Sequence, residues 1–274
     1  MNTKQNLHTH TVYCDGKNTP AEVIQTAIAK GFGSLGFSMH CDPLLDGRNP
    51  DFSEKFEAYK KEILRLKTEW RGKFPIFLGI EYDVYADWYD TVSCCDYMIG
   101  SVHYLKGNGS YIKMDLRNAD MVRECIDVHF GGDFLKFAAS YYESLSELPK
   151  YGSFDIIGHF DLLTKHIGSF PEWDVNCDGY RKLVDGAIDS LRGKIPLFEV
   201  NTGAIPRGYR NEPYPDRYIL KKLRENGFGA VISTDCHNAE HLDCYVEESK
   251  ALLREVGFTS RFMLTENGVA EVGL

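Results

Sequence analysis

Short apolar runs alternate with helical patterns along most of the chain. Each run is bounded by glycine, proline or polar residues, which is typical of strands that are buried on both faces. This pattern predicts seven strands. They cover residues 6–10, 34–40, 76–82, 97–104, 154–161, 196–202 and 230–235.

The segments between these runs have the periodicity of helices. Thr19 and Glu22 form a capping-box sequence with Pro20 at the first helical position, and Gly31 marks the end of that helix. Between Phe52 and Trp70, apolar residues recur at intervals of three and four, which predicts one long amphipathic helix. Further helical patterns cover roughly 118–130, 133–147, 178–192, 215–226 and 239–256.

Strands that alternate with helices are typical of a parallel sheet. We therefore expect an α/β fold: a seven-stranded, TIM-like (β/α)7 barrel formed as a single domain by residues 1–274. An open, doubly wound sheet is the alternative. No G-x-G-x-x-G or P-loop sequence follows the first strand, which argues against the nucleotide-binding form of that alternative.

Composition narrows the classes of function. The 274 residues include 31 Lys and Arg against 40 Asp and Glu, a net charge of −9, which disfavours binding of nucleic acid through a broad basic face. No apolar stretch is long enough to span a membrane, and Met1 to Thr11 has no apolar signal segment. The eight cysteines form no C-x-x-C pair, so we expect reduced thiols in the cytoplasm. The oligomeric state is left open.

Histidines gather at the ends of the predicted strands. His8, His40, His103 and His159 each lie at the end of an apolar run, and His237 lies two residues beyond another. In a parallel barrel these ends open on one face, so the imidazoles are expected to meet there. His10 should join them, because residues two apart on a strand point to the same side.

Three carboxylates occupy comparable positions. Glu81 ends one strand, Asp235 ends another, and Asp15 lies in the loop after the first strand. So many imidazole and carboxylate donors exceed the needs of one tetrahedral ion and suit two or three zinc, manganese or iron ions. The candidate metal ligands are His8, His10, Asp15, His40, Glu81, His103, His159, Asp235 and His237.

In order and spacing, this set resembles the signature of the polymerase-and-histidinol-phosphatase (PHP) family. The matching elements are His8-Thr9-His10, Asp15-Gly16, Met39-His40, Gly79-Ile80-Glu81, Ser101-Val102-His103, Gly158-His159 and Asp235-Cys236-His237. The resemblance implies a distorted seven-stranded barrel with a trinuclear metal centre. It assigns His8, His10, Glu81 and Asp235 to one ion, Glu81, His103 and His159 to a second, and Asp15, His40 and His237 to a third.

Two further segments resemble the histidinol-phosphatase branch of that family. One runs from Glu199 to Arg210, and the other is Gly158-His-Phe-Asp-Leu-Leu followed by Lys165. The resemblance implies hydrolysis of L-histidinol phosphate, a step of histidine biosynthesis. It also implies that Lys165 and Arg207 grip the phosphate, and Arg210 is a further candidate for this contact.

A phosphate monoester suits such a site on chemical grounds. Three divalent ions would outweigh the three carboxylates and create a local positive charge that selects an anion. We expect a metal-bridging hydroxide to attack phosphorus, with Lys165 or Arg207 stabilising the phosphoryl oxygens. Asp161 lies two residues beyond His159 and should share its strand face, where it would serve as the general acid or as a partner behind the ligands. For the amine and imidazole of the substrate, the expected partners are Asp42, Asp83, Tyr104 and Tyr214.

Three other functions compete with this interpretation. A PHP-type nuclease or a nucleotide or bisphosphate phosphatase would use the same ions. An amidohydrolase also begins with H-x-H, but the bridging lysine usual in that group is replaced here by His103. A non-catalytic metal-binding scaffold is the third, although an intact ligand set argues against it. A small-molecule phosphate monoester is the expected partner.

Overall fold

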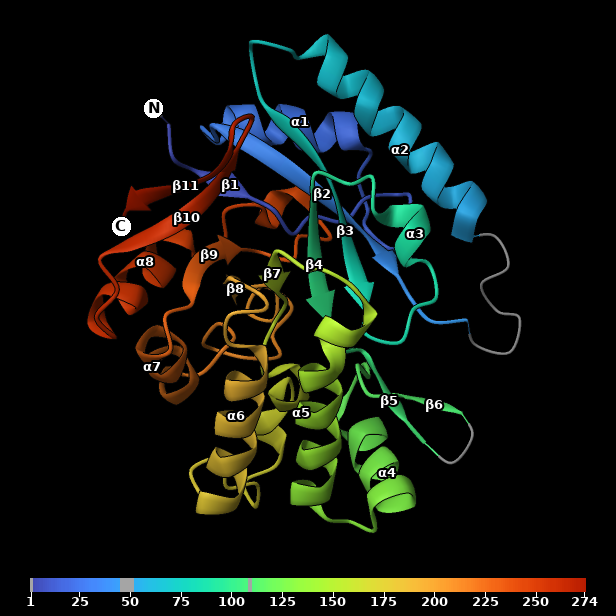
Figure 1. Cartoon of the computed structure of the whole chain (residues 1–274), viewed down its shortest axis with the longest axis vertical. Coiled ribbons are helices and arrows are strands. Elements are labelled where there is room, and N and C mark those ends of the chain that lie inside the picture. Colours follow the sequence, from blue (N-terminus) through green and yellow to red (C-terminus); the bar gives the residue numbers. More distant parts are fainter. Residues whose placement is uncertain (1, 45–51, 108–109) are drawn as a thin grey trace.

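The computed structural model describes residues 2–44, 52–107 and 110–274. Its central element is a sheet of seven parallel strands in the order β1-β2-β3-β4-β7-β8-β9 (Figure 1). The strands are β1 (Gln5–Asn6), β2 (Ser34–Cys41), β3 (Ile76–Asp83), β4 (Tyr97–Ser101), β7 (Ile156–Ile157), β8 (Leu197–Asn201) and β9 (Gly229–Ser233).

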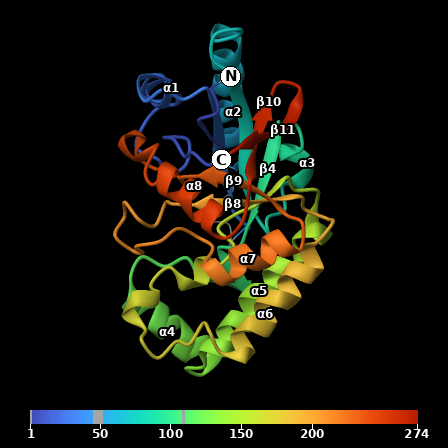
Figure 2. The ribbon, with the colours of Figure 1, turned by 90° about the vertical axis from the view of Figure 1, so that its left-hand side faces the viewer.

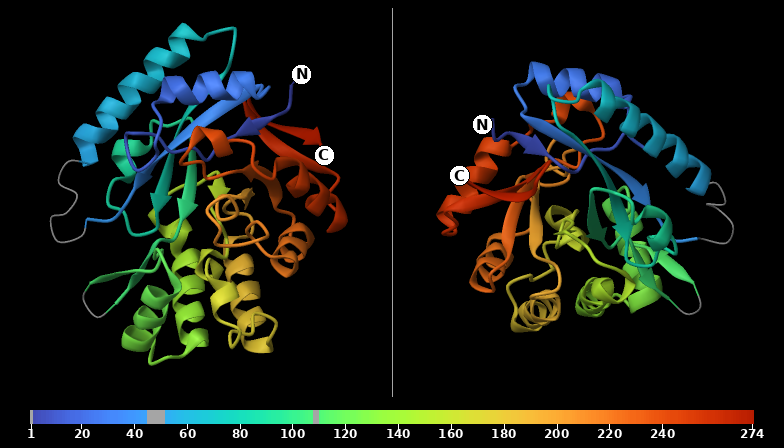
Figure 3. Two further views of the ribbon diagram at one scale, coloured as in Figure 1. Left: turned by 180° about the vertical axis from the view of Figure 1, so that it is seen from behind. Right: turned by 45° about the horizontal axis from the view of Figure 1, so that its top comes forward.

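The first and last strands come together just beyond their ends and nearly close the sheet into a barrel. Thr9 pairs with Cys236 in an isolated parallel bridge. The amide of His10 donates to the carbonyl of Cys236 over 2.9 Å, and the amide of Cys236 donates to the carbonyl of His8 over 3.0 Å. The strands therefore form a ring enclosed by helices (Figure 3, right). The predicted seven-stranded barrel is confirmed, and the open doubly wound alternative is wrong.

Helices cover the outside of this ring, and several sit side by side along one flank in Figure 2. The predicted capping box is present: Glu22 donates its amide to Oγ1 of Thr19, and its carboxylate accepts from the amide of Thr19. The helices are α1 (Pro20–Ala29), α2 (Phe52–Glu69), α3 (Tyr89–Val92), α4 (Ala119–Phe130), α5 (Phe134–Tyr151), α6 (Asp178–Leu191), α7 (Arg217–Glu225) and α8 (Val246–Glu255). Within the described ranges, none is long and apolar enough to cross a membrane.

Apolar side chains form two layers. The larger layer lies between the strands and the helices and includes Phe56, Tyr59 and Ile63 of α2. The smaller layer is contributed by five of the strands and the residue that follows β1, and includes Leu7, Phe77, Tyr97, Ile99, Ile156, Leu197 and Val231. Filling of the barrel by such strand residues makes it a packed core rather than a channel.

Two antiparallel hairpins lie outside the barrel ladder. Strands β5 (Tyr104–Lys106) and β6 (Tyr111–Lys113) follow the carboxyl end of β4. Strands β10 (Ser260–Thr265) and β11 (Gly268–Gly273) lie at the opposite end, where β10 borders β9 (Figure 1). There the amide of Leu264 donates to the side chain of Gln5, and Phe262 and Leu264 pack on the smaller apolar layer. The hairpin therefore covers the amino-terminal end of the barrel.

Three predicted strands were too long by at least three residues at the carboxyl end. β1 ends at Asn6 and β7 ends at Ile157, because the chain turns there to present His8 and His159. The run 97–104 divides into β4 and β5. All three breaks lie at the carboxyl-terminal end of the barrel. There the backbone leaves the hydrogen-bond ladder of the sheet and carries polar side chains.

Candidate metal centre

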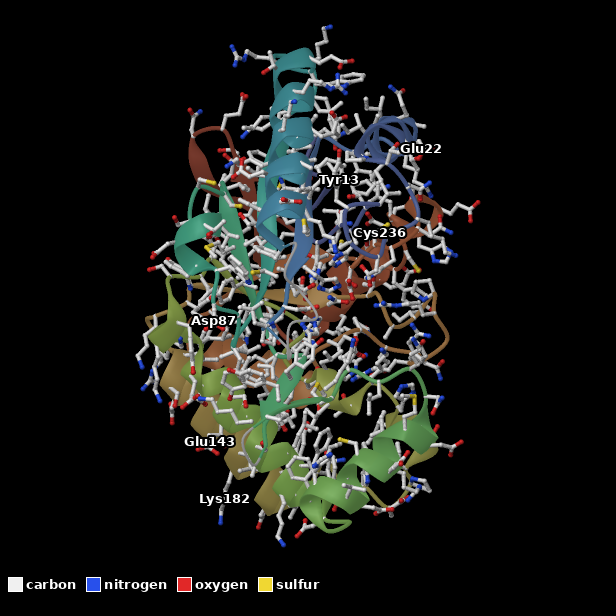
Figure 4. All side chains as sticks on the ribbon, turned by 90° about the vertical axis from the view of Figure 1, so that its right-hand side faces the viewer. Tyr13, Glu22, Asp87, Glu143, Lys182 and Cys236 are labelled. Carbon is white, nitrogen blue, oxygen red and sulfur yellow. The ribbon has the colours of Figure 1, made fainter. Side chains whose placement is uncertain are left out.

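All nine predicted ligands lie at the carboxyl-terminal end of the barrel. In Figure 1 the arrowheads of β3 and β4 mark this end, at the opposite side from the β10–β11 hairpin. Figure 4 labels Cys236, which neighbours two of the candidate ligands in the sequence, inside the outline of the molecule, and labels Glu143 and Lys182 at its edge. Cys236 is indeed buried, between the candidate ligands Asp235 and His237. Residues from six strand ends therefore meet in one interior cluster.

Glu81 is the centre of this cluster. Its Oε2 atom lies 3.1 Å from Nε2 of His8 and 2.9 Å from Nδ1 of His40. Its Oε1 atom lies 3.3 Å from Nε2 of His103 and 2.9 Å from Nε2 of His159. The two oxygens thus face two different sets of imidazoles, which is the arrangement required of a carboxylate that bridges two ions.

Asp235 follows β9, which adjoins the segment of His8 and His10 where the barrel closes, and its carboxylate lies next to both imidazoles. Its Oδ1 atom lies 3.1 Å from Nε2 of His10 and 3.6 Å from Nε2 of His8. The backbone of Asp235 has a φ of 45°, a left-handed conformation that costs energy in a residue other than glycine. This turn comes directly after β9, and it lets both Asp235 and His237 face the cluster although the strand has ended.

A third group lies nearer the solvent. Nε2 of His237 is 3.2 Å from Oδ2 of Asp15, and Nε2 of His40 is 3.5 Å from Oδ1 of the same residue. The side chain of Asp15 is 57% exposed, in contrast to the fully buried Glu81. The loop after β1 therefore folds back over the site.

Burial and opposite charges act against each other on the titrating groups. Burial alone would raise the pKa of Glu81, but His8, His103 and His40 hold that pKa well below its usual range. Burial lowers the pKa of His10 to about 3, with the help of the neighbouring His237 and His40. The cluster therefore favours ionised carboxylates and, at His10, a neutral imidazole. At His8, His40 and His103 burial is outweighed by the neighbouring carboxylates, which raise the pKa of these imidazoles.

Although they lie close together, several of these buried atoms have no partner with hydrogen-bonding geometry among the described residues. They include Nε2 of His8 and His10, Nδ1 of His40 and Oε2 of Glu81. A buried polar group without a partner costs about 1–3 kcal/mol, so a protein rarely leaves several together. Divalent cations would pair with all of them, because imidazole and carboxylate are the donors that zinc, manganese and iron accept. The residues present fit the predicted ions.

A cavity of about 280 Å³ opens directly above the cluster. Basic side chains line it, among them Lys165 and Arg207, which were predicted, and Lys113 and Arg117, which were not. Lys165 donates to Asp115 over 2.6 Å, and Nη2 of Arg207 donates to Oδ2 of Asp235 over 2.7 Å. The cavity thus combines candidate metal ligands with cations that suit an anionic ligand.

A second cavity, of about 600 Å³, adjoins the first. It shares Asp15, His40, His103, Lys113, Asp115 and Arg117 with the smaller cavity. Asp42 and Tyr104 line the second cavity, and Tyr214 lines the first. These three predicted substrate-binding residues therefore face open space next to the candidate ligands.

Three further predicted site residues line neither of the two cavities: Asp83, Asp161 and Arg210. Asp161 is fully buried and lies 3.5 Å from Nη1 of Arg210, which also donates to the hydroxyl of Thr164. The expectation that Asp161 shares a strand face with His159 is wrong, because β7 ends at Ile157. Asp83 is 1% exposed and accepts from the amides of Tyr85 and His103. The geometry gives Asp83, Asp161 and Arg210 structural partners and no access to the two cavities described above.

Sequence reasoning also missed groups next to the ligands. Glu199 was noticed only as part of a resembling segment, yet its buried carboxylate lies 2.9 Å from Nδ1 of His8. Asp115 follows the β5–β6 hairpin, which was not predicted at all. The available signal for Glu199 was a lone acidic residue inside an otherwise apolar strand.

Comparison with known proteins agrees with this geometry. A sequence model of the PHP domain matches residues 6–203, which is well over half of the chain. The chain belongs to the PHP domain family. Seven of the nine candidate ligands lie within the matched region, and the fold brings Asp235 and His237 to them from beyond it.

Individual PHP proteins resemble the chain over most of its length. The histidinol-phosphatase of Bacillus subtilis is 26% identical over 262 residues, covering 86% of this chain and 94% of the relative. A HisK protein of Listeria monocytogenes has the same fold, with a TM-score of 0.76 at 21% identity over 89% of this chain and 99% of the other. The histidinol phosphate phosphatase of Lactococcus lactis, solved with zinc, L-histidinol and phosphate, has a TM-score of 0.71 at 19% identity, covering 97% and 98% of the two chains.

Proposed function

We propose that the chain is a metal-dependent phosphatase that hydrolyses L-histidinol phosphate to L-histidinol and phosphate. The observation that carries the proposal is the meeting of six imidazoles and three carboxylates beneath a cavity lined with basic side chains. The relatives named histidinol-phosphatase, and the related structure that holds L-histidinol and phosphate, support the choice of substrate.

Two or three divalent ions, of zinc, manganese or iron, would be held by the nine side chains in overlapping groups. His8, His10, Glu81 and Asp235 would hold one ion, and Glu81, His103 and His159 a second. Asp15, His40 and His237 would hold a third. When bound, such ions supply Lewis acidity and lower the pKa of water to near neutrality.

The basic side chains would bind and orient the phosphoryl group. Lys165 and Arg207 line the smaller cavity from one side of the barrel, and Lys113 and Arg117 line it from the segment around β6. Fixed cations of this kind stabilise the charge that develops on phosphoryl oxygens during displacement. Tyr214 adds a donor, because its buried hydroxyl has no partner in the described part of the chain.

The larger cavity would receive the amine and the imidazole of the substrate. Asp42 supplies a carboxylate there and Tyr104 an aromatic side chain. Asp115 lines both cavities. Its carboxylate would therefore lie beside the bond that joins the phosphate of the substrate to its organic part. An ammonium group next to the ester carbon would therefore have an acidic partner.

Asp161 would act through Arg210 rather than on the leaving group. Its carboxylate lies beside the guanidinium and also accepts from the amide of Asp216. These contacts link the segment that carries His159 to the loop that carries Tyr214. We therefore assign Asp161 and Arg210 to positioning, in place of direct contact with the substrate.

We further propose that the enzyme works in the cytoplasm on a small molecule and not on nucleic acid. The eight cysteines are free thiols, as expected in a reducing compartment. The net charge of −9 would repel a polynucleotide, while the basic residues around the smaller cavity would still attract a small anion.

A comparison of three substrates tests the proposal. The protein, loaded with zinc or manganese and with its metals counted, is assayed with L-histidinol phosphate, p-nitrophenyl phosphate and a nucleoside 3′,5′-bisphosphate. We expect kcat/KM for L-histidinol phosphate to exceed the others by at least about a thousandfold, since only that ester uses the acidic partners. Equal, low values for all three would overturn the assignment of substrate. A preference for the bisphosphate would favour the alternative phosphatase.

A further inference from the structure

The candidate ligand His8 has a buried hydrogen-bond partner outside the metal cluster. Nδ1 of His8 lies 2.9 Å from Oε2 and 3.1 Å from Oε1 of Glu199, and both side chains are completely buried. Glu199 lies within β8, two strands away from β1 across the point where the barrel closes. The opposite ring nitrogen of His8, Nε2, faces Glu81 and Asp235.

Every other partner of the Glu199 carboxylate is a hydrogen-bond donor. The amide of His159 donates to Oε1 over 2.8 Å, and Nδ2 of Asn201 donates to the same oxygen over 2.7 Å. The orientation of the Asn201 amide is fixed, because its Oδ1 accepts from the amide of Gly203 over 2.9 Å. The carboxylate accepts in both of these contacts, and Nδ1 of His8 lies against its other oxygen as a third donor, which places the proton of the imidazole on Nδ1.

We infer that Glu199 is a positioning residue that sets the tautomer of His8 and the place of His159, and thereby prepares two of the metal positions. With the proton on Nδ1, the lone pair on Nε2 is directed at Glu81 and Asp235, where an ion would bind. The bond to the amide of His159 ties a ligand of the second group to the same carboxylate. This inference rests on the metal centre of the proposed function, but not on the identity of the substrate.

Other candidate ligands have weaker or different partners on the outer ring nitrogen. Nδ1 of His10 lies 3.4 Å from Sγ of Cys14, and Nδ1 of His237 lies 2.9 Å from the carbonyl of Asp235. Nδ1 of His159 has no partner in the described part of the chain. Of these four, His8 is the one whose Nδ1 is hydrogen-bonded to a carboxylate that also accepts from the backbone amide of a second ligand. Loss of Glu199 should therefore act on two groups at once.

Glu199→Gln is the decisive variant because it keeps the shape and removes the charge. Its oxygen can still accept from His159 and Asn201, but its NH2 group would then face Nδ1 of His8 and favour a proton on Nε2. We expect the dissociation constant for zinc, measured with a competing chromophoric chelator, to rise about 10–100-fold. Excess metal should restore much of kcat while KM stays near its original value.

Asp155→Asn is the matched control. Asp155 is also a carboxylate beside a barrel strand, and it accepts from the amide of Met98 over 2.8 Å, away from the cavities. It should lose some stability without losing metal. If Glu199→Gln fails to fold, Glu199→Asp, which keeps the charge but shortens the side chain, should weaken zinc binding in the same direction.

The measurement separates this inference from the proposed function. Zinc affinity that is unchanged in both Glu199 variants, or lowered equally in Asp155→Asn, overturns the positioning role. Failure of the parent protein to hydrolyse L-histidinol phosphate, with zinc affinity still dependent on Glu199, would instead overturn only the substrate. A lower unfolding temperature of the metal-free Glu199→Gln protein with normal zinc affinity would show a merely structural role.

Discussion

Arg207 binds one oxygen of the Asp235 carboxylate, and His10 lies next to the other. Nη2 of Arg207 donates to Oδ2 over 2.7 Å, while Oδ1 lies 3.1 Å from Nε2 of His10. Arg207 also donates from Nε to the carbonyl of Gly203 over 2.7 Å. The cation that faces the cavity is therefore held by a candidate metal ligand, and a change in either residue affects the other.

Replacement of Arg207 should impair catalysis more than folding. We expect Arg207→Gln to lower kcat/KM for L-histidinol phosphate by about 10²–10³-fold, because a donor to the phosphoryl oxygens is lost. Arg207→Lys should recover only part of this, since one ammonium group cannot replace a guanidinium that binds Gly203 and Asp235 with separate nitrogens. Both variants are tested by steady-state kinetics with L-histidinol phosphate and by inhibition with inorganic phosphate. Unchanged phosphate inhibition in Arg207→Gln would contradict the role.

Asp42 and Asp83 should respond differently to the same change. Asp42 lines the larger cavity, so Asp42→Asn should raise KM for L-histidinol phosphate by about tenfold, the loss of one charged contact of roughly 1.5 kcal/mol. Asp83 instead accepts from the amides of Tyr85 and His103. Asp83→Asn should therefore leave KM unchanged and lower the free energy of unfolding by about 1–3 kcal/mol. The opposite assignment of the two effects would refute the geometry.

Removal of the ions should destabilise the fold as well as abolish activity. The cluster of ligands forms only in the folded chain, so ions at a thousand times their dissociation constant contribute about 4 kcal/mol. For a chain of this size, we expect a chelator to lower the unfolding temperature by about 10 °C. Zinc or manganese should restore it, and calcium should not, because calcium prefers oxygen ligands. Equal unfolding temperatures with and without chelator would argue against the centre.

The β10–β11 hairpin should contribute to stability alone. Phe262 packs on the apolar layer inside the barrel and closes on Gly229, where an added methyl group would meet its ring. Phe262→Ala should lower the free energy of unfolding by about 2–4 kcal/mol without altering KM. The control is Val269→Ala, at a side chain that is half exposed, which should change stability by less than about 0.5 kcal/mol. A kinetic effect of Phe262→Ala would indicate coupling across the barrel.

The convergence of the nine candidate ligands could be predicted because each one is tied to a strand end. His40 and Glu81 lie near the carboxyl ends of β2 and β3, and parallel strands in a barrel bring such ends to one face whatever helices connect them. The barrel itself could be predicted because apolar runs alternate with amphipathic segments, which is the pattern of parallel strands joined by helices. Errors in strand length did not change the end of the barrel at which the nine candidate ligands lie.

The remaining errors come from interactions that run between distant segments. Asp161 was placed beside His159 because the apolar run continues past Ile157, but the backbone leaves the ladder there. The partnership of Glu199 with His8 joins residues 191 positions apart, and no local pattern encodes it. The two hairpins were missed because their short strands alternate polar and apolar residues beside an otherwise regular α/β pattern.

The β10–β11 hairpin, which covers the amino-terminal end of the barrel, also determines where a tag or a support can be joined to the protein. The guanidinium of Arg261 donates to the carbonyl of Thr3, and Gln5 binds Leu264. Both ends of the described chain thus emerge on the face opposite the catalytic opening (Figure 1). An affinity tag, a fluorescent protein or a solid support joined at either end would hold the enzyme with its opening toward the solution.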